Sequence, residues 1–298
     1  MPGPFLLPDT AMSLTKQLAH FPLERAVTPN GAVQYRRARA PGFAGAVTHV
    51  LLHGIGSASA SWLAQLVQAR VATAPACHVL AWDAPGYGGS DPLPMDAPAA
   101  QDYAHRFWAW LDAVDADTRG PLTLVGHSLG ALMAARAVLL APARVGRLVL
   151  LAPAQGYGNA AAELREQKLS DRLANLALLG PTGMARKRAG AMLSAAASGE
   201  QLAFVEQVMA GIQPHGYTQA ARMLAGGDLL ADLRQGHCPV SIASGSADTV
   251  TPVDGCRALA AAVHAPYVSL GEVGHSCPLE AAVQANALIG LGGPQHDG

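Results

Sequence analysis

Residues 122–131 read Leu-Thr-Leu-Val-Gly-His-Ser-Leu-Gly-Ala. An apolar run typical of a buried strand ends at Val125, and an alanine-rich helical pattern begins at Leu129. Ser128 stands at the corner between them. A tight strand-to-helix turn of this kind holds its central side chain up in a strained conformation. The pattern therefore predicts a nucleophilic serine at the carboxyl end of a strand.

The two glycines beside this serine are expected to have a steric role. Gly126 and Gly130 leave room where the strand and the helix approach each other closely. The helix, predicted at 129–140, would place its N-terminal amides and its dipole beneath Ser128, where they favour developing negative charge. A five-residue pattern also arises by chance, so the prediction depends on the rest of the chain.

Apolar segments recur along the chain and predict the remaining strands. They lie at 48–52, 78–82, 122–125, 148–151, 240–243 and 267–270. Continuous apolar runs are typical of strands that are covered on both faces. Helix-length segments at 61–72, 97–114 and 129–140 separate several of these strands, and 23–38 is a predicted hairpin with its turn at Pro29-Asn30-Gly31. The alternation predicts an α/β fold with a doubly wound, mostly parallel sheet.

Residues 155–227 interrupt this alternation. They contain helical segments broken at Gly180-Pro181, Ser198-Gly199 and Pro214, without a convincing strand. Because this interval is too long for an ordinary connection, we expect a helical cap over the carboxyl ends of the strands. A separate helical domain or a dimerisation element is the alternative. Residues 21–154 and 228–298 would then form the core, and residues 1–20 a flexible N-terminus.

Composition narrows the class of protein. Half of the 298 residues are hydrophobic, 14% are charged and the formal net charge is -1, which argues against a nucleic-acid partner. The four cysteines form no Cys-x-x-Cys pair, which argues against a zinc ribbon or a dense disulfide framework. The N-terminal apolar patch lacks the basic start of a signal peptide, and no segment is long enough to span a bilayer. We predict a cytoplasmic monomer or homodimer with no membrane partner.

A serine hydroxyl becomes a strong nucleophile only when a base accepts its proton, and the base needs an acidic partner that fixes its tautomer. In sheets of this type the chain order is serine, acid, histidine, with the last two on loops after late strands. Asp248 follows one late predicted strand and His275 follows the next. Two other acidic residues are less well placed to be the acid. Asp254 is expected on the next helix, and Glu272 lies only three residues before His275. The predicted catalytic residues are therefore Ser128, Asp248 and His275.

An oxyanion hole needs two backbone N–H donors aimed at the developing charge. The amide of Leu129, directly after the serine, is the first candidate. The second should come from the glycine-containing loop after an early strand, with Ile55 as the predicted donor and Gly56 as the alternative. Gly54, Gly56 and His127 are the predicted substrate-binding residues.

Two further residues are expected to be structural. His53 is expected to brace the glycine-containing loop, and Asp83 to anchor a second glycine-rich turn at 83–91. Neither loop fits a phosphate or dinucleotide site, because the first lacks the Gly-Lys-Ser/Thr of a P-loop and Pro92 and Pro94 interrupt the second. His127 is expected to point to the opposite side of the elbow and to pack or hydrogen-bond there.

Together, the His-Gly loop, the Asp-x-Pro-Gly-x-Gly-x-Ser turn and the Gly-His-Ser-x-Gly elbow resemble capped members of the α/β-hydrolase superfamily, over roughly residues 23–291. The resemblance implies an eight-stranded sheet with an antiparallel second strand and a helical lid after the sixth strand. It also implies hydrolysis of esters or related bonds, with no metal or organic cofactor.

The predicted function is a serine hydrolase that cleaves a small to medium carboxylic ester or lactone with water, through an acyl-enzyme. The carbon–carbon bond hydrolases of aromatic meta-cleavage pathways are similar, but they usually have Asn and Gly where this chain has His127 and Ala131. Cofactor-free haloperoxidase-like activity needs the same triad, and a non-catalytic binding protein of the same fold is a further alternative. Ser128 excludes the aspartate-nucleophile chemistry of similar dehalogenases and epoxide hydrolases.

The predicted cap contains apolar and basic side chains with two possible roles each. Five large apolar residues either line an acyl pocket or pack the cap helices together; they are Met184, Met192, Phe204, Met209 and Met223. The run Arg186-Lys187-Arg188 either recruits a substrate carboxylate or forms a solvated helix face.

Overall fold

A computed structural model describes residues 12–72, 76–115 and 120–292. Its centre is a single sheet with the strands β1 (Leu23–Thr28), β2 (Gly31–Arg39), β3 (His49–Leu52), β4 (His78–Trp82), β5 (Leu122–His127), β6 (Val145–Leu151), β7 (Val240–Ser244) and β8 (Tyr267–Ser269). Their order across the sheet is β1-β2-β4-β3-β5-β6-β7-β8. Strand β2 pairs antiparallel with β1 and β4, and the other pairs are parallel. The expected eight-stranded, mostly parallel sheet is confirmed.

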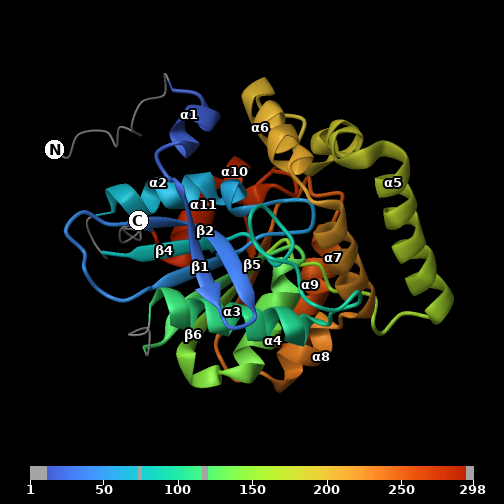
Figure 1. The fold of residues 1–298 in the computed structure, drawn as a ribbon, viewed down its shortest axis with the longest axis horizontal. Helices are drawn as coiled ribbons and strands as arrows, with labels where there is room; N and C mark the ends of the chain where they lie inside the picture. The colour runs from blue at the N-terminus through green and yellow to red at the C-terminus, as the bar shows by residue number, and fades with distance from the viewer. Residues whose placement is uncertain (1–11, 73–75, 116–119, 293–298) are drawn as a thin grey trace.

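Helices cover both faces of this sheet (Figure 1). One face carries α2 (Leu63–Val71), α10 (Cys277–Glu280) and α11 (Ala282–Ile289), and the other carries α3 (Ala100–Val114) and α4 (Gly130–Leu140). Alternate residues of β3 illustrate the division: Leu51 packs in the first core with Leu66, and Leu52 packs in the second with Phe107. Burial on both sides explains the continuous apolar runs of the central strands.

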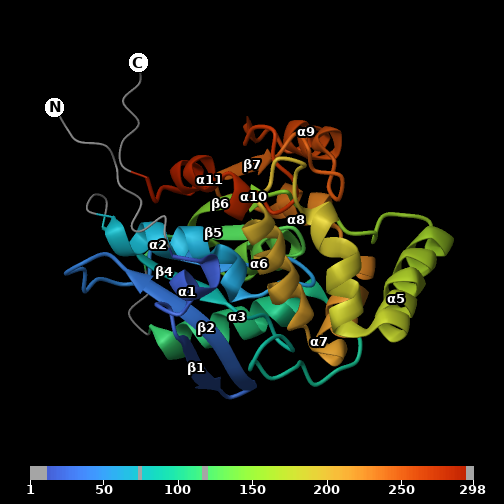
Figure 2. The ribbon, with the colours of Figure 1, turned by 90° about the horizontal axis from the view of Figure 1, so that it is seen from above.

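Only helices lie in the described chain between β6 and β7. They are α5 (Ala162–Arg188), the short 3-10 helix η3 (Ala189–Met192), α6 (Gly199–Ala210), α7 (Pro214–Gly226) and α8 (Leu229–Gln235). Helices α5, α6 and α7 stand together at one end of the molecule (Figure 2), and α8 packs on α4. Helix α5 bends at Gly180, whose φ of 61° interrupts the helix, and Pro181 follows. The predicted division into core and cap at residues 155–227 stays a prediction.

The N-terminal segment contacts these helices. Of the predicted flexible stretch 1–20, residues 1–11 lie outside the described residues, and Leu14–Leu18 form α1. The Leu14 amide donates a hydrogen bond to Glu200 Oε1 of α6 (2.6 Å), and Thr15 Oγ1 donates one to Gln207 Oε1 (3.0 Å). Helix α1 therefore joins the start of the sheet to α6.

Close packing around the serine turn gives a first stability prediction. A Cβ atom at Gly130 would lie 2.2 Å from the Leu52 carbonyl oxygen of β3. Gly130→Ala should therefore lower the free energy of unfolding by roughly 1–3 kcal/mol or more, because the strand or helix has to shift. Gly199→Ala is the matched control, since a Cβ there meets nothing within 4 Å at the start of α6. Urea unfolding, monitored by circular dichroism, measures the stability of both variants. Equal stability of the two would contradict the packing argument.

Candidate active site

Ser128 lies directly after β5 in a strained backbone conformation. Its φ is 51°, in the left-handed region that non-glycine residues rarely occupy. Its amide donates to the Leu151 carbonyl of β6 (3.0 Å), and its carbonyl accepts from the Ala154 amide (3.1 Å). The neighbouring strand end thus holds the turn from both sides, as the elbow pattern predicted.

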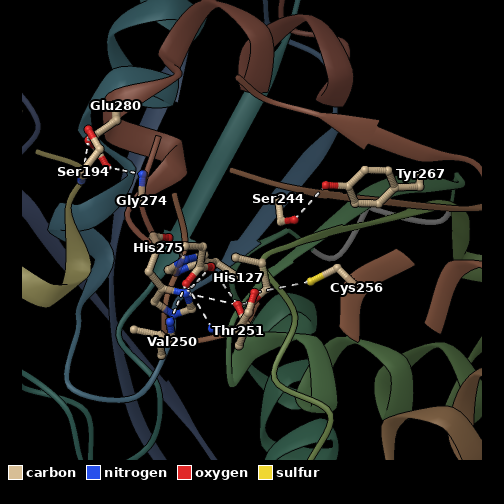
Figure 3. Close-up of polar contacts among 12 residues, drawn as sticks. His127, Ser194, Ser244, Val250, Thr251, Cys256, Tyr267, Gly274, His275 and Glu280 are labelled. Atoms are coloured by element: carbon tan, nitrogen blue, oxygen red, sulfur yellow. Dashed lines mark hydrogen bonds and ion pairs between the residues drawn. The ribbon is translucent and has the colours of Figure 1, made fainter. Parts of the chain in front are cut away.

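Asp248 and His275 meet on the loops that follow β7 and β8. His275 Nδ1–H donates to Asp248 Oδ2 at 2.8 Å, and both residues are buried. The other carboxylate oxygen, Oδ1, accepts from the amides of Val250 (2.7 Å) and Thr251 (3.0 Å) (Figure 3). These two strands are neighbours in the sheet, so residues that lie 27 positions apart come into contact.

The carboxylate is held in its ionised form. Burial acts to raise the pKa of Asp248, but the hydrogen bond and charge interaction with His275 and the hydrogen bonds from Thr251 outweigh it, and the pKa lies below its ordinary value. An ionised Asp248 accepts the Nδ1 proton of His275. That arrangement fixes the tautomer and leaves Nε2 able to accept a proton.

Thr251 is a member of this cluster that the sequence analysis missed. Its hydroxyl lies 2.8 Å from Asp248 Oδ2, 3.1 Å from the Ala152 carbonyl and 3.2 Å from His275 Nδ1. The two acceptors near this hydroxyl are Asp248 Oδ2 and the Ala152 carbonyl, and the single hydroxyl proton is shared between them. The spacing of Asp248 and Thr251 could have predicted this contact, because a Thr three residues after an Asp can form a turn that the side chains cap.

The loop after β3 lies against Ser128. A Cβ at Gly54 would be 2.8 Å from Ser128 Cβ, which only glycine avoids. His53 Nε2 accepts from the Ala84 amide (3.0 Å), so its Nδ1–H donates to the Gly54 carbonyl (2.8 Å). Burial lowers the pKa of His53 and keeps it neutral. The predicted bracing role of His53 is confirmed.

Asp83 anchors the second glycine-rich turn, as predicted. Its Oδ1 accepts from the Ser59 amide at 2.6 Å, and its carbonyl accepts from Ser90 Oγ at 2.6 Å. The residue thus joins the turn at 83–90 to the 3-10 helix η1 (Ser59–Trp62).

Two amides beside the serine have no acceptor among the described residues. They belong to Ile55, on the loop after β3, and Leu129, at the start of α4. The Gly56 amide, the alternative donor, is directed at Tyr87 Oη at 3.5 Å. Ile55 and Ser128 line the same cavity. Both predicted oxyanion donors therefore lack an acceptor in the described chain, and of the two only Ile55 is a lining residue of this cavity. Their role as an oxyanion hole stays a prediction.

His127 holds the backbone of His275. Its Nε2–H donates to the His275 carbonyl at 2.8 Å, and the two rings lie 4.9 Å apart. Burial, with the neighbouring His275 second, lowers the pKa of His127 to about 3. The predicted hydrogen-bonding role is thus observed. The expected position on the opposite side of the elbow is wrong, because the bond to His275 places the ring beside the cavity that Ser128 also lines. His127 also lines a cavity at Ser128, and its Nδ1 has no partner in the described chain.

The neutral state of His127 predicts acid-sensitive folding. The unfolded ring takes up a proton near pH 6.5 and the folded ring only near pH 3, so between these values the unfolded state binds more protons. The free energy of unfolding should therefore fall as the pH is lowered from 6.5, by roughly 2 kcal/mol at pH 5 from this residue alone. His49 and His78, whose burial lowers each pKa to about 4, add to the effect.

Urea unfolding at pH 7 and pH 5 measures this effect. His127→Asn, which removes one titrating ring, should show a smaller difference between the two pH values than the wild type. An identical pH dependence in both proteins would exclude the proposed protonation state.

Two cavities meet at Ser128 and His275. The larger has a volume of about 240 Å³ and is lined by Met184, Met192 and Met209 among others. The smaller, of about 50 Å³, includes Phe204 and Met192. Four of the five predicted pocket residues therefore line one of these two cavities, whereas Met223 lines neither and packs in the core.

Glu280 joins the η3 segment to the His275 loop and was also missed. Its carboxylate accepts from the Ser194 amide (2.9 Å), Ser194 Oγ (2.6 Å) and the Gly274 amide (2.8 Å) (Figure 3). The Ser276 amide donates to the Met192 carbonyl at 2.7 Å. The residues on both sides of His275 are therefore tied to the segment between β6 and β7.

The described residues contain no cluster of three or more His, Cys, Asp or Glu side chains suited to a metal ion. Within the same residues, no helix has the length and apolar character needed to cross a membrane.

A family model described as "Alpha/beta hydrolase family" matches residues 50–287. The chain belongs to the alpha/beta hydrolase family. This assignment agrees with the fold and with the predicted resemblance.

Several known proteins are similar to this chain. The (E)-2-((N-methylformamido)methylene)succinate hydrolase of Acinetobacter baylyi is 29% identical over 67% of this chain and 72% of its own length. A 2-hydroxy-6-oxononadienedioate/2-hydroxy-6-oxononatrienedioate hydrolase of Paraburkholderia xenovorans is 31% identical over 38% of each chain. The enol-lactonase structure from Burkholderia xenovorans LB400 superposes with a TM-score of 0.76 at 19% identity, covering 90% of this chain and 99% of that one. At this identity, the structural match shows the fold.

Proposed function

We propose that this protein is a serine hydrolase that cleaves a small or medium carboxylic ester or lactone through an acyl-enzyme. The observation that carries the proposal is the buried 2.8 Å hydrogen bond between Asp248 and His275, next to a cavity that also contains the strained Ser128. A nucleophile, a histidine and an ionised acid at one cavity form the arrangement that acyl transfer needs. The family membership supports the hydrolase class.

In the proposed mechanism, His275 Nε2 takes the proton of Ser128 Oγ as this oxygen attacks the carbonyl carbon of the substrate. The carbonyl π electrons move to oxygen, and the amides of Ile55 and Leu129 stabilise the resulting oxyanion. Collapse breaks the bond to the alkoxy group, which leaves with the proton from His275. Water then attacks the acyl-enzyme with His275 again as base, and the acid is released with free Ser128.

The site residues have distinct proposed roles. Asp248 orients His275 and stabilises its charged form, and Thr251 positions both of these side chains. Gly54 and Gly56 allow the substrate to approach the backbone closely, and the His127 side chain forms part of the wall of the smaller cavity. A small-molecule substrate and water are the reactants.

The cavity volumes indicate a substrate of limited size. An apolar cavity of about 150 Å³ accepts a molecule the size of benzene. The larger cavity, at about 240 Å³, thus suits one arm of roughly that size or somewhat more, and the smaller, at about 50 Å³, suits a short group. We therefore expect short esters and small lactones to be better substrates than long-chain lipids.

Hydrolysis of a carbon–carbon bond is the second candidate. It is supported by the similar oxononadienedioate hydrolases, because the name of these enzymes describes a ketone and no ester. Their similarity extends over only 38% of this chain, and His127 stands at the elbow position where Asn is usual in such enzymes.

A substrate panel tests the proposal. Methyl esters of two to eight acyl carbons, five- and six-membered lactones and a vinylogous 1,5-diketone acid would be assayed, with rapid-quench mass spectrometry for a covalent acyl adduct. We expect ester or lactone turnover and an acyl group on the peptide that contains Ser128. Turnover of the diketone alone would favour carbon–carbon cleavage, and turnover of no compound in the panel would contradict the ester proposal.

A further inference from the structure

Two arginines from α5 line the larger cavity together with Ser128 and His275. Arg172 lies before the bend at Gly180 and Arg188 lies at the end of the helix, so the bend allows both arms to reach the same space. Both side chains are partly buried. The cavity is thus lined both by two arginines of α5 and by Ser128 of the turn after β5.

The charge of this cavity is uncompensated. Apart from the two arginines, its charged or titratable lining is limited to His275, Cys256 and two tyrosines, and no Asp or Glu of the described chain is among the lining residues. Neither arginine forms an ion pair or side-chain hydrogen bond within residues 12–72, 76–115 and 120–292. A guanidinium in a partly apolar cavity loses hydration, which an anionic ligand can offset.

The neighbouring basic residues Arg186 and Lys187, unlike Arg172 and Arg188, have partners on the protein surface. Arg186 Nε lies 3.8 Å from Glu206 Oε1, and Lys187 Nζ donates to Asn175 Oδ1 at 3.1 Å. Both are exposed. Of the run Arg186-Lys187-Arg188, therefore, Arg188 reaches the cavity and the other two make surface contacts.

We propose that the substrate carries a carboxylate, which Arg172 and Arg188 bind while the ester or lactone carbonyl lies at Ser128. This inference rests on the proposed hydrolase function and adds the charge of the substrate. A planar guanidinium pairs with a carboxylate through two parallel N–H···O bonds, which fixes the orientation of the anionic arm. The preferred substrates are then half-esters of dicarboxylic acids or lactones that bear an acid side chain.

Matched pairs of esters test the charge preference. Monomethyl succinate, glutarate and adipate would be compared with methyl butyrate, pentanoate and hexanoate, in which a methyl group replaces the carboxylate, by titration of released acid at constant pH. We expect higher kcat/KM for the anionic member of at least one pair. Arg188→Gln and Arg172→Gln should each lower that value about 10- to 100-fold, and change the neutral ester less than about threefold.

Two control variants accompany these substitutions. Arg186→Gln removes an exposed charge from the same helix end and should leave both esters unchanged. Arg188→Lys, which keeps the charge without the planar fork, should recover part of the lost activity toward the anionic ester. An equal loss for anionic and neutral esters in Arg188→Gln, or a wild type that prefers the neutral member of every pair, would overturn the inference.

A binding measurement separates this inference from the proposed function. Glutarate and its neutral analogue glutaramide would be titrated calorimetrically into Ser128→Ala, which needs no turnover. Glutarate binding that exceeds glutaramide binding at least tenfold and disappears with Arg188→Gln supports the anion site, even if every ester proves inert. Equal or undetectable binding of the two compounds would refute the anion site, whatever the esterase assay shows.

Discussion

Ser128→Ala should abolish ester and lactone hydrolysis, with kcat reduced on the order of 10⁶-fold and the fold retained. The loss is large because the residue supplies the atom that forms the acyl-enzyme, and no other hydroxyl can replace it at the strained turn. Alanine also fits the turn sterically, since it removes only the hydroxyl. The measurement is steady-state kinetics on the best ester of the panel, with circular dichroism as the check on folding.

Ser57→Ala is the matched control for this variant. Ser57 lines the smaller cavity beside Ser128, on the loop after β3. Its removal should change kcat less than tenfold. Near-normal turnover by Ser128→Ala would show that the reaction does not proceed through this serine.

Asp248→Asn should lower kcat on the order of 10⁴-fold, the second largest effect that we expect. The amide oxygen can still accept the Val250 and Thr251 amides, but an NH₂ group then faces His275 Nδ1 in place of the acceptor at 2.8 Å. The ring would adopt the other tautomer, with its proton on Nε2, and could not take the proton of Ser128. Steady-state kinetics between pH 6 and 9 measures the loss.

Asp254→Asn is the control for the acid. Asp254 lies in the first turn of α9 (Val253–Ala262), six residues after Asp248, and should be dispensable. If Asp254→Asn lost the activity and Asp248→Asn kept it, the assignment of the acid would be wrong.

The fold was largely predictable from the sequence, because burial on both faces makes the central strands continuous apolar runs. Strand β4 has the predicted bounds, His78–Trp82. Strand β6 begins three residues before its predicted start, at Val145, because Gly146 and Arg147 interrupt the apolar run while the backbone continues to pair with β5. Turn chemistry also identified the hairpin, where Gly31 has a φ of 118°.

The site was predictable where motif and topology agree, as for Asp248 and His275, which the structure brings into contact. The contacts between Glu280 and Ser194 were not predictable, since they join residues 86 positions apart. The basic run was equally ambiguous, because helical spacing alone does not say which of Arg186 and Arg188 faces the cavity. Met192 and Met223 have the same chemistry, yet only the packing of the helices places one at the cavity and the other in the core.

Covalent labelling tests whether Ser128 is an activated nucleophile, and it needs no knowledge of the substrate. Wild-type protein and Ser128→Ala would be treated with a fluorophosphonate, followed by intact-mass measurement and peptide mapping. We predict one adduct per wild-type chain, on the peptide that contains residues 122–131, and none on Ser128→Ala. An unlabelled wild type, or equal labelling of both proteins, would contradict the account.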